Sequence, residues 1–308
     1  MKNNYCVLFS CITLSLLVQA TAYAQDITLE HLWETDGLNN PESVVYDGKS
    51  RTIYVSNVNG QASEKDGNGY ISRLSPDGKV LDKEWIKGLN APKGLALSGG
   101  KLYTADIDTL VEINIAKAAI TNRYQVADAK FFNDVAAAPN GDIYVSDMSM
   151  NRIHLLHDGK FSIWLETPDL LNPNGVLVQG KNLIVGAWGV MTDGSNTKIP
   201  GHLLKISLQD KSIQNIGDGL PVGNLDGVEP YKDNGYLVTD WMAGKLMHIT
   251  TSGEVTGLLK LEQGTADLAF IPEMDLVLLP MMNSNKLIAY KTHEYEDEEA
   301  GDEVEEED

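Results

Sequence analysis

The chain repeats one pattern of short strands and turns six times, and this repeat restricts its fold more than any other feature. The stretch 225–250 (LDGVEPYKDNGYLVTDWMAGKLMHIT) contains a complete unit: a carboxylate beside a glycine, a turn, a strand-like run, a glycine-containing connection and a second strand-like run. Equivalent residues follow one another at steps of 49, 41, 41, 52 and 41, namely Asn57, Asp106, Asp147, Trp188, Asp240 and Met281. A period of about forty with several short strands is typical of propeller blades. We therefore predict an all-β, six-bladed β-propeller.

A propeller is stable only if its first and last blades are joined, because an open sheet edge leaves backbone groups unpaired. Residues 27–33 form a strand-like run before the first repeat, and the last repeat ends at Tyr290 with no further strand behind it. We therefore predict that residues 27–33 complete the last blade as its outer strand. No linker divides the body of the chain, which we interpret as one domain spanning residues 25–293.

The N-terminal end differs from the body in composition. Residues 1–24 combine a basic residue, a short apolar run and the sequence AYA, which is typical of a secretory signal peptide cleaved after Ala24. The alternative is a membrane anchor, which the short apolar run disfavours. Cleavage removes Cys6 and Cys11, the two cysteines of the chain. We therefore expect a cysteine-free mature protein with no membrane span, periplasmic or secreted.

Much of the net charge of −20 comes from the C-terminal end. Residues 294–308 contain eleven Asp and Glu residues. Such a segment cannot bury apolar surface, and we predict a disordered acidic tail that favours solubility, or else buffers cations weakly or makes an electrostatic contact. The acidic mature chain has no cluster of Lys and Arg, which argues against nucleic acid as a partner.

Polar residues recur where the innermost strand of each repeat begins. In a propeller these strand starts converge on one mouth of the central channel. Four of the positions carry hard oxygen donors: Glu42, Asn133, Asn174 and Asp226. This donor set suits Ca²⁺ better than Zn²⁺, and it is also compatible with Mg²⁺ or Mn²⁺. We predict a divalent-cation site, with Asp226 acting also as general base or nucleophile.

Other polar features of the repeat have a structural interpretation. Asn-Gly and Asp-Gly pairs are common in turns, so each candidate ligand taken singly has an alternative role as a turn residue. Four residues recur at the far end of the next strand, and we interpret them as turn caps: Asn57, Asp106, Asp147 and Asp240. The polar loops 58–68 and 191–200 lengthen two blades and are either surface insertions or a lining of the mouth.

Several of these motifs resemble those of a known family. The motifs are DG at 226–227 followed by DNGYLV at 233–238, NGV at 174–176, NDV at 133–135, and Glu42 before VVYD at 44–47. Together they resemble the metal-site motifs of the SMP-30/gluconolactonase family, which is itself similar to the paraoxonases and the squid-type phosphotriesterase. The resemblance spans residues 25–293 and implies a six-bladed propeller with a divalent cation held by Glu42, Asn133, Asn174 and Asp226. It also implies hydrolysis of lactones or related esters, with Asp226 acting on the substrate or its attacking water.

The surroundings of the site depart from that family. The glutamate lies in the sequence NPES (40–43) rather than in a glycine-rich setting, and two phenylalanines replace the arginine that sugar-lactone members often carry before the Asn-Asp pair. Loss of this donor makes the mouth more apolar. We therefore expect an aliphatic or aromatic lactone or ester as the small-molecule substrate, contacted by Asn133, Phe131, Phe132, Trp188, Trp241 and Met242. Packing between blades is the alternative role of these apolar side chains.

The sequence offers no support for several other chemistries. It contains no G-x-S-x-G elbow, no H-E-x-x-H motif and no Walker loop. Three hypotheses remain: a metal-dependent hydrolase, a non-catalytic propeller that binds a ligand or protein partner and uses the cation for stability, and an enzyme of another reaction class with the same metal site. Propellers host many unrelated functions, so the fold alone does not choose between them.

Overall fold

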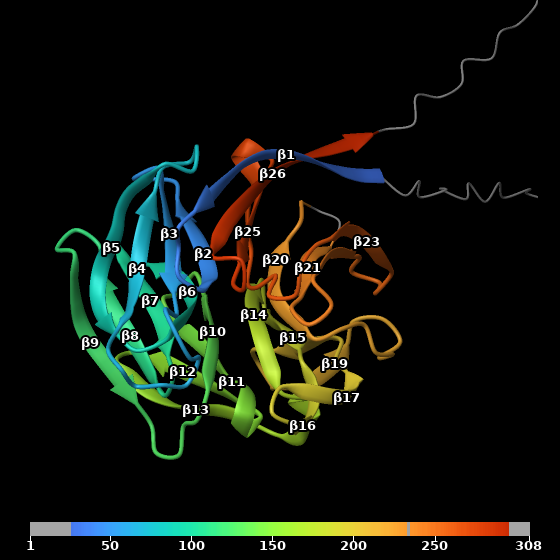
Figure 1. The fold of residues 1–308 in the computed structure, drawn as a ribbon. Helices are drawn as coiled ribbons and strands as arrows, with labels where there is room; N and C mark the ends of the chain where they lie inside the picture. The colour runs from blue at the N-terminus through green and yellow to red at the C-terminus, as the bar shows by residue number, and fades with distance from the viewer. Residues whose placement is uncertain (1–25, 233–234, 296–308) are drawn as a thin grey trace, which may run out of the picture. The chain divides into compact units, whose positions relative to one another are not determined.

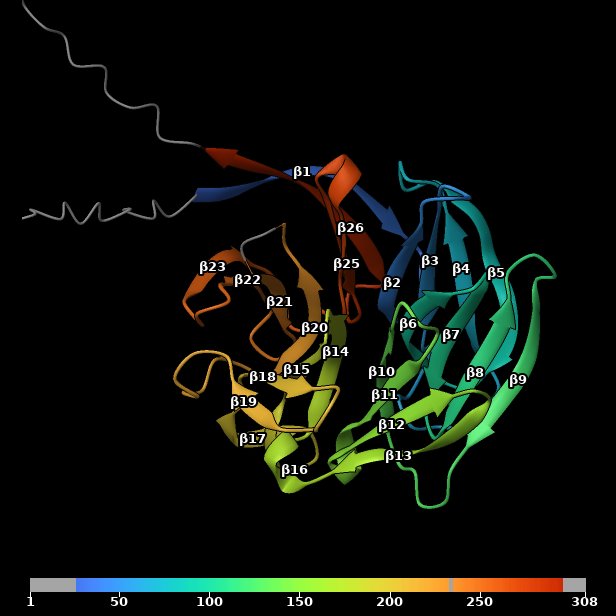
Figure 2. The same cartoon turned by 180° about the vertical axis from the view of Figure 1, so that it is seen from behind.

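The computed structural model describes residues 26–232 and 235–295, of which Ile27–His293 form one compact unit. Six four-stranded sheets are arranged in a ring (Figures 1 and 2). The prediction of an all-β, six-bladed β-propeller is therefore confirmed. The predicted signal peptide lies outside the described residues, as does all of the predicted tail except Glu294 and Tyr295. These two residues belong to strand β26 (Lys286–Tyr295), which continues past its expected end at Tyr290.

The blades are named in chain order, and their strands run from the channel outwards. Blade 1 contains β2 (Pro41–Asp47), β3 (Thr52–Asn57), β4 (Gly69–Leu74) and β5 (Val80–Leu89), and blade 2 contains β6 (Pro92–Ser98), β7 (Lys101–Asp106), β8 (Thr109–Asn114) and β9 (Ala119–Gln125). Blade 3 contains β10 (Phe132–Ala137), β11 (Ile143–Asp147), β12 (Arg152–His157) and β13 (Lys160–Glu166), and blade 4 contains β14 (Pro173–Gln179), β15 (Asn182–Ala187), β18 (Leu203–Ser207) and β19 (Ile213–Asn215). Blade 5 contains β20 (Leu225–Pro230), β21 (Tyr236–Asp240), β22 (Lys245–Ile249) and β23 (Val255–Lys260), and blade 6 contains β24 (Ala269–Ile271), β25 (Leu276–Met281), β26 and β1 (Asp26–Asp36).

The remaining elements lie between these strands. The hairpin of β16 (Gly189–Asp193) and β17 (Asn196–Pro200) joins the second and third strands of blade 4. Three short 3₁₀ helices are η1 (Met148–Met150), η2 (Pro168–Leu170) and η3 (Pro272–Met274). Within the described part of the chain, no helix has the length and apolar character needed to cross a membrane.

An irregularity at the start of the innermost strand repeats in blades 1 to 5. The strand pairing skips two residues there, at positions 42–43, 93–94, 133–134, 174–175 and 226–227. A bulge of this kind bends the strand and redirects its side chains. Because it occurs at the same place in each blade, the first residue of each pair faces the mouth of the channel. Residues that lie about forty or more positions apart in the sequence therefore form a ring of side chains around the mouth of the channel.

Apolar side chains fill the space between neighbouring blades. Each of the six interfaces contains a cluster of buried residues, including the interface between blades 6 and 1. The cluster between blades 6 and 1 joins Val44 and Leu74 of blade 1 to Leu278 and Leu287 of blade 6. The innermost strands of neighbouring blades also contact one another around the whole ring. The hydrophobic effect therefore stabilises the ring mainly through its interfaces between blades.

Strand β1 closes the ring as the sequence predicted. It is the outer strand of blade 6 and lies beside β26 in both views (Figures 1 and 2). Trp33 packs on the cluster between blades 6 and 1 and lies against Gly78 in the turn between β4 and β5. Thr35 Oγ1 donates a hydrogen bond to the Gly78 carbonyl at 2.6 Å. A side chain at Gly78 would collide with the Trp33 ring, so this glycine is required for the closure.

The glycines that follow two candidate ligands are required by close packing at the channel. Gly175 and Gly227 lie inside β14 and β20, so the turn explanation of these pairs does not hold. A Cβ atom at Gly175 would collide with the carbonyl oxygen of Asp226, and one at Gly227 would lie 2.6 Å from Oδ1 of Asp267. Glycine therefore allows neighbouring inner strands to approach closely, which brings Asn174 near Asp226.

Candidate functional site

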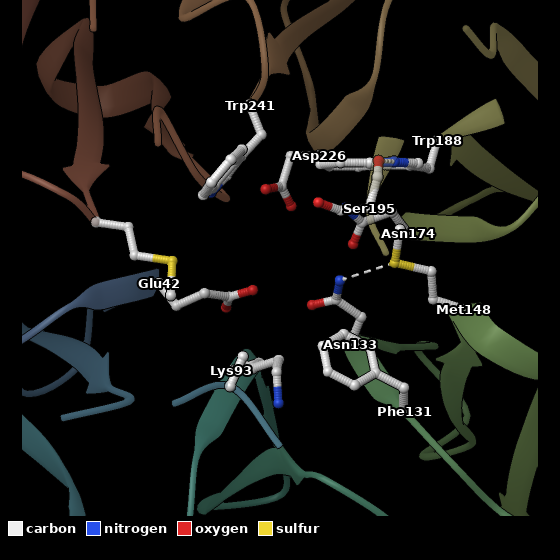
Figure 3. Close-up of a pocket in the computed structure, with 12 residues that line it drawn as sticks. Glu42, Lys93, Phe131, Asn133, Met148, Asn174, Trp188, Ser195, Asp226 and Trp241 are labelled. Atoms are coloured by element: carbon white, nitrogen blue, oxygen red, sulfur yellow. Dashed lines mark hydrogen bonds between the residues drawn. The ribbon is translucent and has the colours of Figure 1, made fainter. Parts of the chain in front are cut away.

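The four predicted ligands meet in one pocket at the mouth of the channel. Glu42, Asn133, Asn174 and Asp226 are each the second residue of an innermost strand. Their carboxylate and amide groups are directed at a common space (Figure 3). The pocket encloses about 620 Å³, including open solvent at its mouth. Its lining consists of Glu42, Ala62, Lys93, Phe131, Asn133, Met148, Asn174, Trp188, Ser195, Asp226, Trp241 and Met282.

The polar atoms of this pocket fit a cation. Oε2 of Glu42 and Oδ1 of Asn174 are buried and accept no hydrogen bond from the residues that the structure describes. The amide nitrogen of Asn133 donates to Sδ of Met148 at 3.7 Å, which leaves its oxygen directed at the common space (Figure 3). Buried acceptors without donors are unfavourable unless a ligand binds them. Two carboxylate and two amide side chains form a donor set that Ca²⁺ accepts.

The amides are essential to this donor set. Over residues 26–232 and 235–295, no group of three His, Cys, Asp or Glu side chains is placed to hold a metal ion. The two carboxylates of the pocket, Glu42 and Asp226, could therefore hold a cation only together with the amide oxygens of Asn133 and Asn174.

The two carboxylates lie in an environment that disfavours negative charge. Burial, followed by the nearby charges of Asp226 and Asp267, raises the pKa of Glu42 well above its ordinary value, while Lys93 opposes the shift. Burial and the charge of Asp267 also raise the pKa of Asp226, against the effect of a hydrogen bond from Asn174. A positive charge bound between the two carboxylates would counteract both shifts.

A second group of carboxyl side chains lies further along the inner strands. Asp134, Glu229 and Asp267 line a separate cavity of about 750 Å³, including open solvent. Burial raises the pKa of all three carboxyl groups, that of Asp267 to about 7. Asp134 accepts a hydrogen bond from the backbone N–H of Val176, and Asp267 accepts one from Ser43 Oγ at 2.5 Å. Asp134 and Asp267 therefore connect inner strands of different blades.

Lys93 is a pocket residue that the sequence analysis did not include among its site residues. It is the second residue of β6, in the same phase as the four candidate ligands, and only 2% of its surface is exposed. Its Nζ donates to the Ala91 carbonyl at 3.0 Å and lies 4.6 Å from the centre of the Phe131 ring. Burial lowers the pKa of Lys93 to about 8, and the charges of Glu42 and Asp106 oppose the shift. Its position in the repeat, which it shares with the candidate ligands, would have indicated that Lys93 faces the pocket. It was not selected because the candidates were chosen as oxygen donors, and lysine is not one.

Apolar side chains form much of the pocket wall, and four of them share a position in the repeat. Met148, Trp188, Trp241 and Met282 each follow directly after the second strand of their blade. The equivalent of Asp147 in blade 4 is therefore Ala187, and the repeat assignment of Trp188 from the sequence is one residue too far along the chain. The predicted substrate contacts Trp188 and Trp241 therefore face the pocket, with ring centres 6.2 Å apart. Met148 and Met282 were not predicted as contacts, although both occupy the same repeat position as Trp241.

Phe132 does not face the pocket, so its assignment as a substrate contact is wrong. It is fully buried between blades 2 and 3, with its ring centre 4.8 Å from that of His154 and 5.8 Å from that of Phe161. Phe131 lines the pocket instead. Successive side chains of an extended chain point to opposite sides, so only one of the pair faces the channel. The lining residues that the structure describes do not include Met242.

The four residues interpreted as turn caps are confirmed in that role. Asn57, Asp106 and Asp147 accept hydrogen bonds from backbone N–H groups just before the innermost strand of their own blade. Asp240 accepts one from the N–H of Ala243 in the turn that follows it. These caps fix the backbone that leads to the pocket residues of blades 1, 2 and 3.

Both lengthened blades contribute to the pocket. Residues 58–68 connect the second and third strands of blade 1, and the β16–β17 hairpin makes the same connection in blade 4. Ala62 of the first connection and Ser195 of the second line the pocket. The Trp188 side chain donates through Nε1 to the Ser195 carbonyl at 2.8 Å, which fixes the hairpin over the wall. The loops therefore line the mouth through these two residues.

Solved structures with the same fold include enzymes of two reaction classes. A gluconolactonase from Xanthomonas campestris matches with a TM-score of 0.63 and 14% sequence identity, covering 86% of this chain and 89% of that chain. The chain has a gluconolactonase-like propeller fold. A virginiamycin B lyase from Staphylococcus aureus matches with a TM-score of 0.60 and 16% sequence identity, covering 86% of this chain and 99% of that chain. A streptogramin B lyase matches with a TM-score of 0.61 and 11% sequence identity, covering 89% of this chain and 100% of that chain. A scan of family models and a search of curated proteins both find no match. At these identities the gluconolactonase-like propeller is a statement about fold, not about reaction.

Proposed function

We propose that this protein is a divalent-metal-dependent hydrolase of the SMP-30/gluconolactonase type that acts on a lactone or related ester and is periplasmic or secreted. The observation that carries the proposal is the pair of buried oxygens without donors, Oε2 of Glu42 and Oδ1 of Asn174, in one pocket with Asn133 and Asp226. The fold shared with a gluconolactonase is compatible with this reaction class but does not select it. The hard oxygen donors favour Ca²⁺ as the cation.

Asp226 is the residue we assign to the chemistry. A bound divalent cation would polarise the substrate carbonyl and stabilise negative charge on its oxygen. As a general base, Asp226 accepts a proton from water, the resulting hydroxide adds to the carbonyl carbon, and the ester C–O bond breaks as the alcohol oxygen takes a proton. As a nucleophile, the Asp226 carboxylate adds to the carbonyl, the alcohol leaves with a proton, and water hydrolyses the acyl-aspartate. Oxygen from labelled water enters Asp226 in a single turnover only by the nucleophilic route, when water adds to the carboxyl carbon of Asp226. Water that adds to the substrate acyl carbon places the label in the product acid by either route.

The wall of the pocket favours an apolar substrate. Phe131, Met148, Trp188, Trp241 and Met282 surround the candidate ligands with aromatic and thioether side chains. Such a lining stabilises an aliphatic or aromatic body and offers few donors to the hydroxyl groups of a sugar. We therefore favour aliphatic or aromatic lactones and esters over sugar lactones.

The test is a calorimetric titration with Ca²⁺ followed by assays with apolar lactones and esters. We expect one site in the wild type and at least about tenfold weaker binding in Asp226→Asn and Glu42→Gln, since each removes a charged oxygen ligand. Asp158→Asn, at an aspartate whose side chain is 93% exposed, is the matched control and should bind as the wild type. Asp226→Asn should also hydrolyse at least about 10²-fold more slowly. Cation binding that ignores both pocket variants would overturn the proposal.

Two outcomes point to the other hypotheses. The fold shared with virginiamycin B lyase favours elimination as a second candidate, in which a base removes a carbon-bound proton and a C–O bond breaks without water. Mass spectrometry separates the two reactions, because the hydrolysis product contains one added water and the elimination product does not. Cation binding without turnover of any lactone or ester would favour the non-catalytic propeller, with the cation serving stability and the channel face binding a ligand or protein partner.

A further inference from the structure

Lys93 brings a positive charge into the pocket without a direct salt bridge to a carboxylate, although the charges of Glu42 and Asp106 act on it from further away. Its side chain is almost fully buried, and its Nζ donates one hydrogen bond, to the Ala91 carbonyl at 3.0 Å. In the part of the chain that the structure describes, no salt bridge joins this ammonium to Glu42 or Asp226. The Phe131 ring also lies beside the ammonium, with its centre 4.6 Å away.

Such a charge is unfavourable unless something binds it. A buried ammonium has lost its hydration, which a single neutral carbonyl and an aromatic face replace only in part. The ammonium has three N–H donors, of which the Ala91 carbonyl takes one. The others are available to a molecule in the pocket that Lys93 lines.

The charges of the pocket favour an anionic group beside Lys93. Glu42 and Asp226 carry two negative charges when ionised, which a bound divalent cation would neutralise. Asp106 also acts on Lys93, but its oxygens accept hydrogen bonds from the backbone N–H groups of Asn90 and Ala91. The ammonium would then be left without a directly bound anion. Figure 3 shows Lys93 and Phe131 across the pocket from Asp226 and Trp241. A molecule whose carbonyl lies near Asp226 therefore spans the pocket before a second group reaches Lys93.

We propose that Lys93 binds an anionic group of the substrate, so that the substrate is an apolar ester or lactone that also carries a carboxylate. The reaction rests on the proposed function, whereas the anion site rests on Lys93 and on a cation bound by Glu42 and Asp226, and does not require turnover. In this arrangement the carboxylate accepts hydrogen bonds from Lys93, and the apolar body contacts Phe131 and Trp241. Lys93 is thus the specificity-determining residue of the pocket.

Binding of a matched pair of ligands tests the anion site without any turnover. Quenching of intrinsic tryptophan fluorescence, to which Trp188 and Trp241 of the pocket contribute, reports the binding of phenylbutyrate and of its neutral analogue phenylbutyramide, both in the presence of Ca²⁺. We expect the wild type to prefer the carboxylate by about tenfold or more, as for a charge-assisted hydrogen bond in a desolvated site. Lys93→Met should lose the preference and Lys93→Arg should keep it. Lys130→Met, which removes an exposed lysine beside Phe131 in sequence, should leave it unchanged.

Three results would overturn the anion site. One is equal affinity of the wild type for the carboxylate and the amide. Another is a preference that survives in Lys93→Met but disappears with a chelator, since the carboxylate would then bind the cation rather than the lysine. The third is loss of the preference in Lys93→Arg when its thermal unfolding matches the wild type, because this variant retains the charge.

Hydrolysis of matched esters separates the anion site from the proposed reaction. Nitrophenyl hemisuccinate ends in a carboxylate, whereas nitrophenyl butyrate is neutral and of equal acyl length. Lys93→Met should raise KM for the hemisuccinate about tenfold and leave KM for the butyrate within about twofold. Lys93-dependent binding of phenylbutyrate with no hydrolysis of either ester would refute the hydrolase and support the anion site. Hydrolysis of both esters with no dependence on Lys93 would support the hydrolase and refute the anion site.

Discussion

The carboxylate of Asp134 accepts a hydrogen bond from the backbone N–H of Val176 at 2.7 Å, across the interface between blades 3 and 4. Asp134 follows Asn133 directly, and Val176 lies two residues after Asn174. This one bond therefore fixes two candidate ligands relative to each other. The acceptor is buried, so no water substitutes for it without rearrangement.

Asp134→Ala should weaken both the fold and the cation site. We expect the free energy of unfolding to fall by about 2–3 kcal/mol, because the Val176 N–H is left buried without its acceptor. Ca²⁺ affinity should fall at least about tenfold as Asn133 and Asn174 lose their relative placement. Urea unfolding and calorimetry measure the two effects, with Asp36→Ala, at an exposed aspartate of β1, as control. An unchanged Ca²⁺ affinity in Asp134→Ala would show that the ligands are placed by other contacts.

The repeat phase predicted the ring and most of the site. Glu42, Asn133, Asn174 and Asp226 occupy one position in the repeat, and a propeller brings one position of every blade to one place. The closing strand was predictable for a similar reason, since an uncovered edge in the last blade is unfavourable.

The details that the sequence analysis missed depend on register and on long-range contacts. Whether Phe131 or Phe132 faces the channel depends on the register of β10, in which Phe132 pairs with Asp147, and local composition does not reveal this register. The bond from Val176 to Asp134 spans 42 residues and has no local signature. Lys93 shared the phase of the ligands, so attention to position rather than to side-chain chemistry would have found it.

Glu112 in blade 2 makes the stability of the fold depend on pH. Burial favours the neutral form of its carboxyl group, but hydrogen bonds from Thr121, Lys101, Asn122 and Tyr124 outweigh burial and lower the pKa of Glu112 to about 2. The ordinary pKa is 4.5, so the folded state binds this proton less readily than the unfolded state. The ionised carboxylate therefore stabilises the fold above about pH 4.5, and this contribution is lost as the pH falls towards 2.

Glu112→Gln should lower the free energy of unfolding by about 2 kcal/mol at pH 7. This expected loss is smaller than the pKa difference alone implies, because Lys101, a partner of Glu112, is partly exposed and solvent screens their attraction. The difference from the wild type should shrink as the pH falls below about 4.5. Urea unfolding at a series of pH values measures it, and the exposed Glu254→Gln should follow the wild-type curve. A difference that is constant over this pH range would show that the charge of Glu112 does not stabilise the fold.

Trp33 and Leu32 test the closure of the ring from neighbouring positions on β1. Trp33 packs on the cluster between blades 6 and 1, whereas Leu32 is 45% exposed. Trp33→Ala should lower the free energy of unfolding by about 2 kcal/mol or more, and Leu32→Ala by less than about 0.5 kcal/mol. Equilibrium unfolding of both variants measures the contrast. Similar small losses in the two variants would mean that β1 contributes little to closure.

Ala62 and Ser63 separate a loop that lines the pocket from one that merely lies on the surface. Ala62 lines the pocket, and its neighbour Ser63 is exposed. Ala62→Trp should raise KM for an apolar ester at least about tenfold, because the large side chain occupies space needed by the substrate. Ca²⁺ affinity should stay within about twofold of the wild type, since the oxygen ligands lie on the innermost strands. Ser63→Trp adds the same side chain outside the pocket and should change neither quantity. Equal effects of the two substitutions in steady-state kinetics would show that this loop is a surface insertion with no part in substrate binding.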